Sequence, residues 1–98
     1  MKKVERKKLF KKAFDKWGLE SQLLMLMEEC AELTQSASKV IRYHKNKTSV
    51  WRSLIEEIAD VEILIEQIET CVDWENIRQR VNTVKYDKLR RLKRVVEE

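Results

Sequence analysis

The sequence predicts an all-α protein, a helical bundle of about four helices. The chain has no proline and one glycine among its 98 residues, so few positions interrupt a helical backbone. Helix-forming residues dominate a composition that is 43% hydrophobic and 39% charged. Apolar residues recur at three- and four-residue spacing, as on the core-facing side of an amphipathic helix. A chain of this length is expected to form a single domain over residues 1–98.

The first half of the chain is expected to form two helices, over residues 3–16 and 20–43. The first places apolar side chains on one side and lysines on the other, and Gly18 is expected to end it. The second carries a long apolar stripe, which indicates a buried side. That stripe consists of Leu19, Leu23, Leu26, Met27, Cys30, Leu33, Ala37 and Ile41.

A polar connector over residues 44–49 is expected to lead into a third helix over residues 50–72. Thr48 or Ser49 is the candidate N-cap of this helix, because a hydroxyl can accept a hydrogen bond from the free backbone N–H groups of the first turn. His44 is expected to be an exposed loop histidine.

The third helix is apolar on nearly all sides. A chain of about 100 residues buries only about 60 to 65% of its unfolded surface, so one copy cannot easily cover such a helix. We therefore expect oligomerisation to complete the bundle. The apolar positions of this helix are Trp51, Leu54, Ile55, Ile58, Val61, Ile63, Leu64, Ile65, Ile68 and Val72.

A fourth helix is expected over residues 74–97, with Asp73 as its candidate N-cap. Charge is distributed unevenly along the chain. Residues 1–20 and residues 78–98 each hold eight Lys or Arg against three acids, whereas residues 21–77 hold five against eleven. The net charge of +4 therefore hides an acidic centre between two basic ends.

No part of the sequence predicts a membrane or secretory segment. No stretch approaches the roughly 18 consecutive apolar residues of a membrane span. The Lys-rich N-terminus lacks the apolar run and the small-residue cleavage site of a signal peptide. We therefore expect a cytoplasmic protein without membrane association.

Two acidic segments, one in the second expected helix and one in the third, have the same pattern of acidic positions. Residues 28–33 read EECAEL and residues 56–61 read EEIADV. Each segment places two acids one helical turn apart, beside the apolar stripe where neighbouring helices meet. Those pairs are Glu29 with Glu32 and Glu57 with Asp60.

Four carboxylates at a helix seam would repel one another. Like charges at this spacing cost a few tenths of a kcal/mol per pair on an exposed helix. At a partly buried seam the cost is larger, on the order of several kcal/mol per ion. A hard divalent cation such as Mg²⁺ would relieve the repulsion if the two helices pack antiparallel. Alternatively, these are solvated acids paired with lysines, although Asp60 has no Lys or Arg within four positions.

The two acidic motifs and their flanks resemble those of the MazG-like, all-α nucleoside triphosphate pyrophosphohydrolases. The motif E-E-x-x-E matches residues 28–32, and E-x-x-D matches residues 57–60 after 24 intervening residues. Trp17-Gly18 and Gln22-Leu23 before the first motif, and Lys39 after it, are similar to small bacterial and phage members. The match runs from about residue 17 to residue 72.

The resemblance implies a hydrolase of nucleotide-pool house-cleaning that depends on Mg²⁺, with Mn²⁺ as an alternative. The reaction would convert a ribo- or deoxyribonucleoside triphosphate to the monophosphate and pyrophosphate, in a homodimer or homotetramer. Glu28, Glu29 and Glu57 would be catalytic, with Glu28 binding a second metal ion or orienting the attacking water. The implied metal ligands are Glu29, Glu32, Glu57 and Asp60.

Substrate binding would need cations for the phosphates and a pocket for the base. Lys39, Lys85, Lys88 and Arg91 are the candidate phosphate-binding residues, although each would equally suit a solvated surface. Trp17, Gln22, Met25 and Tyr86 are candidates for the base pocket, with Trp17 also suited to the core or an interface.

A different class of function is a non-enzymatic helical module that binds nucleic acid or regulates a partner. The two basic ends would supply phosphate contacts that are blind to sequence and sensitive to salt. A third alternative keeps the fold and uses the metal ion only for structure. No nucleic-acid-reading motif accompanies the basic ends, so the nucleic-acid-binding hypothesis rests on charge alone.

Overall fold

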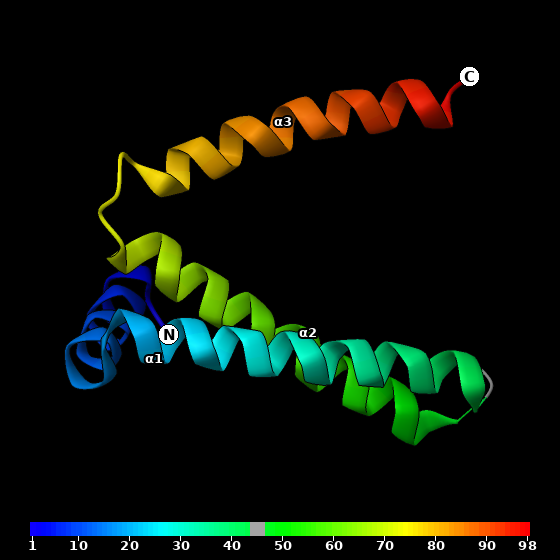
Figure 1. Cartoon of the computed structure of the whole chain (residues 1–98), viewed down its shortest axis with the longest axis horizontal. Coiled ribbons are helices and arrows are strands. Elements are labelled where there is room, and N and C mark those ends of the chain that lie inside the picture. Colours follow the sequence, from blue (N-terminus) through cyan, green and yellow to red (C-terminus); the bar gives the residue numbers. More distant parts are fainter. Residues whose placement is uncertain (44–46) are drawn as a thin grey trace.

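A computed structural model describes residues 1–43 and 47–98, which form three α-helices (Figure 1). Helix α1 spans Lys3–Arg42, α2 spans Thr48–Cys71 and α3 spans Ile77–Val96. The described residues contain no strand, so the all-α prediction is confirmed. The expected number of about four helices is wrong, because the first two expected helices are two arms of α1.

Gly18 bends α1 without ending it. Its backbone angles, φ 82° and ψ 165°, are not helical and lie in a region that is essentially restricted to glycine. As a result the N-terminal arm and the C-terminal arm of α1 run in different directions (Figure 1). A Cβ atom built on Gly18 would meet no atom within 4 Å, so the backbone angles, and not lack of space, require glycine here.

The C-terminal arm of α1 packs antiparallel against α2 (Figure 1). We call this pair, residues 19–42 and 48–71, the hairpin. Its seam buries apolar and polar side chains together, including the fully buried Gln22. The buried apolar residues of the described chain are Phe10, Val40, Val50, Val61 and Leu64, and the buried polar ones are Gln22, Ser36 and Gln67.

The helix ends differ from the sequence predictions. Lys47 is the N-cap residue of α2 and its side chain makes no capping hydrogen bond, so the prediction of a Thr48 or Ser49 cap is wrong. Residues 44–46, which include His44, lie outside the described part of the chain. Helix α3 begins later than expected, and Asp73 does not cap it, because Asn76 with φ 55° and ψ 53° immediately precedes it.

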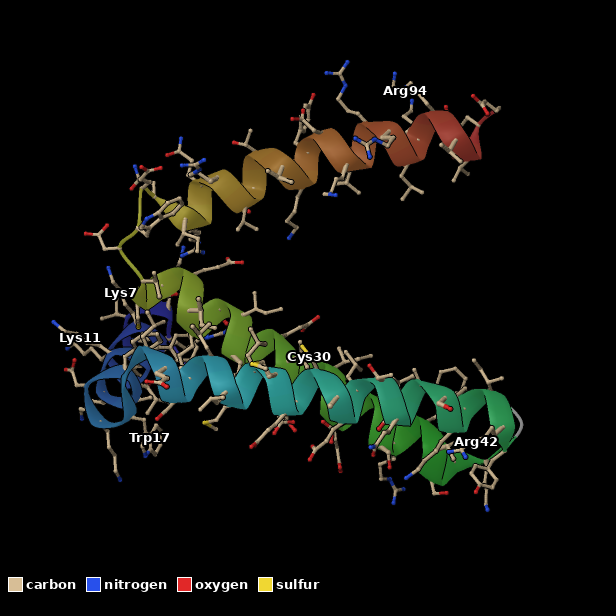
Figure 2. The ribbon with its side chains drawn as sticks, in the orientation of Figure 1. Lys7, Lys11, Trp17, Cys30, Arg42 and Arg94 are labelled. Atoms are coloured by element: carbon tan, nitrogen blue, oxygen red, sulfur yellow. The ribbon has the colours of Figure 1, made fainter. Side chains whose placement is uncertain are left out.

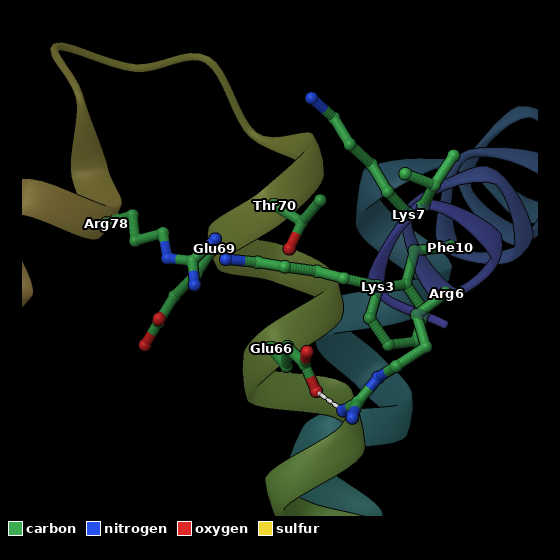
Figure 3. A pocket seen from close by; sticks show the side chains of 9 residues that line it. Lys3, Arg6, Lys7, Phe10, Glu66, Glu69, Thr70 and Arg78 are labelled. Carbon is green, nitrogen blue, oxygen red and sulfur yellow. Dashed lines mark hydrogen bonds and ion pairs between the residues drawn. The ribbon is translucent and has the colours of Figure 1, made fainter. Parts of the chain in front are cut away.

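The basic N-terminal arm of α1 packs against the last turns of α2, where Arg6 pairs with Glu66 (Figure 3). A cavity of about 340 Å³ at this junction is lined by Lys3 and Arg6 from α1, by Thr70 from α2 and by Arg78 from α3, among others. The free carbonyl groups at a helix C-terminus favour cations. Basic residues from both ends of the sequence, Lys3 and Arg6 from one and Arg78 from the other, thus line a cavity at the negative end of α2.

Helix α3 projects away from the hairpin. Among the described residues it contacts only α2, and none of its residues is buried. Its side chains project outward on both sides along the length of the helix, as far as Arg94 near the C-terminal end (Figure 2). Much of α2 is also uncovered, with Ile55 exposed to 64%, so the apolar helix expected to be buried on nearly all sides is not buried within one chain.

None of the helices in the described residues is both long enough and apolar enough to cross a lipid bilayer.

We predict that Gly18→Ala destabilises the protein by about 1–3 kcal/mol, because alanine is strained at this φ and ψ. At an ordinary helical position the same change would stabilise the protein by roughly 0.5–1 kcal/mol, so the sign of the effect identifies the bend. Urea unfolding followed by circular dichroism measures it. Ser38→Ala, at an exposed position within α1, is the control and should be neutral or slightly stabilising. A gain in stability for Gly18→Ala would contradict the prediction.

Candidate metal centre and adjoining cavity

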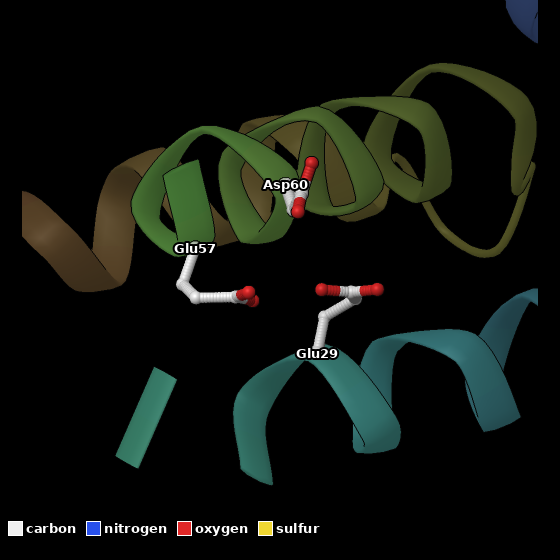
Figure 4. Close-up of side chains that lie close together, drawn as sticks. All are labelled: Glu29, Glu57 and Asp60. Atoms are coloured by element: carbon white, nitrogen blue, oxygen red, sulfur yellow. The ribbon is translucent and has the colours of Figure 1, made fainter. Parts of the chain in front are cut away.

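Three acids from the two helices of the hairpin meet across its seam (Figure 4). Glu29 comes from α1, and Glu57 and Asp60 come from α2. Each offers a carboxylate oxygen, and these oxygens all lie within 4.8 Å of one another. Residues at similar sequence distances from the connection meet in an antiparallel pair, and Asp60 follows Glu57 by one turn. We call these three residues the acid cluster.

Within residues 1–43 and 47–98, no basic side chain forms an ion pair with the acid cluster. Glu29 and Glu57 are half-buried, and each has one oxygen, Oε2, that is shielded from solvent and has no hydrogen-bond partner. The ion pairs found in the described residues involve none of the cluster; they are Arg6–Glu66, Arg80–Glu75 and Lys93–Glu97. The alternative of solvated acids paired with lysines therefore does not describe Glu29 and Glu57.

The surroundings of Glu29 and Glu57 favour the protonated forms of these two side chains. A hydrogen bond to the Glu57 carboxyl, assisted by burial and by the surrounding negative charges, raises the pKa of Glu29 from 4.5 to about 7. Burial is the main reason that the pKa of Glu57 is also raised, and the charges of Glu32 and Asp60 add to it. Two carboxyl groups in direct contact cannot both ionise freely, so the pair titrates together.

The structure brings together three of the four predicted metal ligands. Glu32 is exposed and not among the three acids whose oxygens converge, although its charge contributes to the raised pKa values of Glu29 and Glu57. Glu28, predicted to be catalytic, is exposed and also lies outside the acid cluster. Both flank Glu29 on the same helix.

A cavity of about 220 Å³ adjoins the acid cluster and is lined by three of the four predicted base-pocket residues, whereas the fourth, Tyr86 on α3, does not line it. Trp17, half-exposed, lies beside the bend at Gly18, and Gln22 is completely buried. Gln22 accepts a hydrogen bond from Gln67 of α2. The residues lining this cavity are Trp17, Gln22, Met25, Glu29, Asp60, Ile63, Leu64 and Gln67.

Gln67 was not predicted from the sequence. The signal that could have found it is its position in α2, two turns after Asp60, just as Gln22 lies two turns before Glu29 in α1. A polar side chain on a seam, at the same spacing from an acid on each helix, is unusual enough to merit attention.

The predicted phosphate-binding lysines are not gathered at the acid cluster. Lys39 is exposed on α1, ten residues beyond Glu29 in the direction of the connection. Lys85 and Lys88 lie on α3, which makes no contact with α1 among the described residues. Within one chain, the acid cluster and the basic helix that could balance it are therefore apart.

The chemistry of the acid cluster suits a hard divalent cation. Its donors are all carboxylate oxygens, which Mg²⁺ and Mn²⁺ prefer, and two of those oxygens are buried without a partner. The cluster contains no histidine or cysteine, the ligands that typify zinc sites. The residues present therefore fit a magnesium or manganese ion.

Similarity to known proteins supplies no family for this chain. Comparisons with protein-family models, with curated proteins and with solved structures found no match. What can be inferred about function therefore comes from the acid cluster, the adjoining cavity and the charges around them.

We predict that the metal-free protein loses stability as the pH rises from about 4.5 through 7. Glu29 binds its proton more tightly in the folded chain than in the unfolded chain, so its contribution to stability is fully present below pH 4.5 and lost as the folded group ionises near pH 7. Urea unfolding in the presence of a chelator, at pH 5.5 and at pH 7.5, measures the loss.

In Glu29→Gln the loss over this pH range should be clearly smaller, because the amide cannot ionise. Glu56→Gln is the matched control, since Glu56 is an exposed acid of α2 outside the acid cluster and should leave the wild-type pH dependence in place. Parallel pH dependences for the wild type and Glu29→Gln would show that the acids do not interact as described.

Proposed function

We propose that the protein is a nucleoside triphosphate pyrophosphohydrolase that depends on Mg²⁺ or Mn²⁺. It would convert a ribo- or deoxyribonucleoside triphosphate to the monophosphate and pyrophosphate, as an enzyme of nucleotide-pool house-cleaning. The observation that carries this proposal is the acid cluster with two buried, unpartnered oxygens, next to a cavity with a buried amide. The resemblance of residues 28–32 and 57–60 to the MazG-like motifs supports it.

Glu29, Glu57 and Asp60 would hold the cation, with Glu32 joining them by a change of its exposed side chain. A bound divalent ion would supply charge neutralisation at the phosphates and lower the pKa of a coordinated water. It would also convert the repulsion between the acids into attraction, so that Glu29 gives up its proton.

Several side chains around the acid cluster would have roles of their own. Glu28 is exposed beside Glu29 and remains the candidate for orienting the attacking water. Lys39 is a candidate phosphate-binding lysine on the same helix as Glu29, whereas Lys85 and Lys88 lie on α3. The Trp17 ring would offer an apolar face at the outer wall of the cavity.

We also propose that the functional unit is a homodimer or homotetramer. The hairpin carries ten acidic and three basic residues, whereas α3 carries eight basic residues and one acidic residue. Opposite charges on two uncovered amphipathic surfaces favour association of one copy's α3 with another copy's hairpin. Such an arrangement would bring Lys85 and Lys88 of one chain toward the acids of another.

A second candidate function is nucleic-acid binding through α3. The observation that favours it is the same excess of basic residues on a helix with no buried residue. This binding would weaken steeply between low and moderate salt, and it would be indifferent to Glu57→Gln, since phosphate contacts do not involve the acid cluster. The enzyme is preferred because charge on α3 does not account for the buried, unpartnered carboxylates.

We predict that the protein releases pyrophosphate from at least one common nucleoside triphosphate in the presence of Mg²⁺. Asp60→Asn should lower kcat/KM by more than about 100-fold, because even the partners of metal ligands are worth 10–100-fold. A coupled pyrophosphate assay and chromatography of the monophosphate product measure the reaction. Glu56→Gln, which changes an exposed acid four residues away, should retain activity within about threefold.

Absence of turnover with all eight common nucleotides, in both Mg²⁺ and Mn²⁺, would contradict the proposed activity. Equal activity in wild type and Asp60→Asn would show that the acid cluster is not the site of reaction.

We predict that the protein elutes at the mass of two or four chains, measured by light scattering after gel filtration. Leu92→Glu should shift the mass toward one chain, because Leu92, 55% exposed in a single chain, lies on the apolar stripe of α3 that Val81, Val84, Leu92 and Val95 form. Gln79→Glu introduces the same charge on the opposite side of α3 and should leave the mass unchanged. A wild-type protein that is monomeric at all concentrations tested would contradict the assembly.

A further inference from the structure

We infer that the cavity beside the acid cluster binds a one-ring base with an exocyclic amino group, and that Gln67 recognises this group. Cytosine is such a base, whereas uracil has a carbonyl oxygen at the same ring position. This inference rests on the proposed function, because it names the class of nucleotide that the same site would prefer. The feature that assigns the preference is the free amide oxygen of Gln67.

Gln67 presents a hydrogen-bond acceptor to the cavity. Its side chain lines the cavity and is only 7% exposed. Its Nε2 donates to Gln22 Oε1, whereas its Oε1 accepts no hydrogen bond from the described residues. The fully shielded, unpartnered atom of this amide pair is Gln22 Nε2, so Gln67 Oε1 is the free atom that a ligand can reach. An amide oxygen accepts hydrogen bonds and cannot donate them, so the ligand must supply the donor.

The hydrogen bond between the two amides fixes which atom of Gln67 faces the cavity. Gln22 is completely buried and accepts through its Oε1, so the N–H group of Gln67 is held toward the seam. Turning Gln67 over by itself would bring two amide oxygens together and break this hydrogen bond, which is costly at a buried position. Gln22 is thus a positioning residue for the Gln67 oxygen.

The place of Gln67 along α2 determines which part of a base it meets. Gln67 lies seven residues after Asp60, which is about 10 Å along the helix axis from the acid cluster. If the acid cluster holds the metal ion and the phosphates, the part of the base that reaches Gln67 is the part farthest from the sugar. In a pyrimidine nucleotide that part is the substituent opposite the glycosidic nitrogen, an amino group in cytosine and a carbonyl oxygen in uracil.

These two substituents behave in opposite ways against an acceptor. The amino group of cytosine would donate an N–H to Gln67 Oε1 and complete its hydrogen bonding. The carbonyl oxygen of uracil would face another oxygen, leave both unpaired and lower the affinity. A site with a polar group placed for a substrate N–H discriminates strongly against the analogue that lacks it.

The rest of the cavity suits a single flat ring. Its volume of about 220 Å³ is below the roughly 300–1,000 Å³ of ordinary small-molecule sites, which favours a pyrimidine over a purine. Met25, Ile63 and Leu64 contribute apolar surface. The half-exposed Trp17 ring offers a face on which a base can stack.

The alternative is that the two glutamines only tie α1 to α2. A structural hydrogen bond accounts for Gln22 Oε1 and Gln67 Nε2, and water would then satisfy Gln67 Oε1. The two hypotheses differ in a measurable way. A structural bond affects stability alone, whereas an amide that recognises the base also affects the ratio between two substrates.

The test compares substrates that differ by an amino or a carbonyl group at one ring position. We predict that kcat/KM with Mg²⁺ is at least about tenfold higher for CTP than for UTP, and for dCTP than for dUTP. The dissociation constants of α,β-methylene-CTP and α,β-methylene-UTP, which cannot be cleaved at the relevant bond, should differ in the same direction when measured by calorimetry.

Three variants test the roles of the two amides separately. Gln67→Met removes the acceptor, so the CTP/UTP ratio should fall to within about threefold. Gln22→Met leaves Gln67 free to turn over, so the ratio should fall as well. Gln22→Glu supplies an ionised carboxylate that only accepts, so Gln67 Nε2 still has its acceptor and the preference for CTP should be restored. Gln35→Met, at an exposed glutamine of α1, is the matched control and should keep the wild-type ratio.

The outcomes separate this inference from the proposed function. Hydrolysis of nucleotides without a preference for CTP, or with a preference for UTP, would overturn the base assignment and leave the enzyme proposal standing. Preferential binding of α,β-methylene-CTP by a protein that hydrolyses nothing would support the base site and end the proposed activity. If neither analogue binds, or if a folded Gln67→Met protein keeps the wild-type ratio, the inference is wrong. Circular dichroism establishes that each variant is folded, and the wild-type comparison needs no variant at all.

Discussion

The repulsion between carboxylates at the seam of the hairpin is the constraint on which the account of this protein depends. Folding α1 against α2 buries apolar side chains, and the same act presses Glu29 against Glu57 and Asp60. Two of their oxygens are then cut off from solvent and from any partner among the described residues. The metal-free chain limits the cost by retaining protons, as the raised pKa values indicate. Apolar residues at such a position usually stabilise a chain more than buried charges do, which is why we propose that a bound cation offsets the burial of these acids.

A single chain also leaves apolar surface exposed and keeps its opposite charges apart. Its buried apolar residues are few, while Ile55, Leu89 and many other large apolar side chains remain exposed. Helix α3 leaves its apolar stripe uncovered and carries most of the positive charge, whereas the hairpin carries the negative charge. The acid cluster and the cations that could balance phosphates are thus separated within one copy. Association between copies would cover the exposed apolar side chains and bring the cations of α3 toward the acids of the hairpin. We therefore propose it as part of the functional unit.

The sequence predicted the helical structure and the meeting of three of the four acids because both follow from local periodicity. The repeated spacing in residues 28–33 and 56–61 places acids beside an apolar stripe on each helix, and an antiparallel turn then brings them together. It did not predict the helix count, since a glycine can either end a helix or bend it, and the angles of Gly18 decide which. Gln67 was missed because its partner depends on the register of the two helices. The direction of α3 could not be predicted either, because it depends on the left-handed angles of Glu75 and Asn76.

The most direct measurement is calorimetric titration of Mg²⁺ and Mn²⁺ into the metal-free protein at pH 7, in buffers of different ionisation enthalpy. The account predicts uptake of about one ion per chain, with release of about half a proton from Glu29, because its pKa of about 7 leaves it half-protonated at this pH. The uptake should be lost in Glu57→Gln, whose folded structure should otherwise be preserved. A wild-type protein that takes up neither ion, or that binds them equally well after Glu57→Gln, would contradict the account.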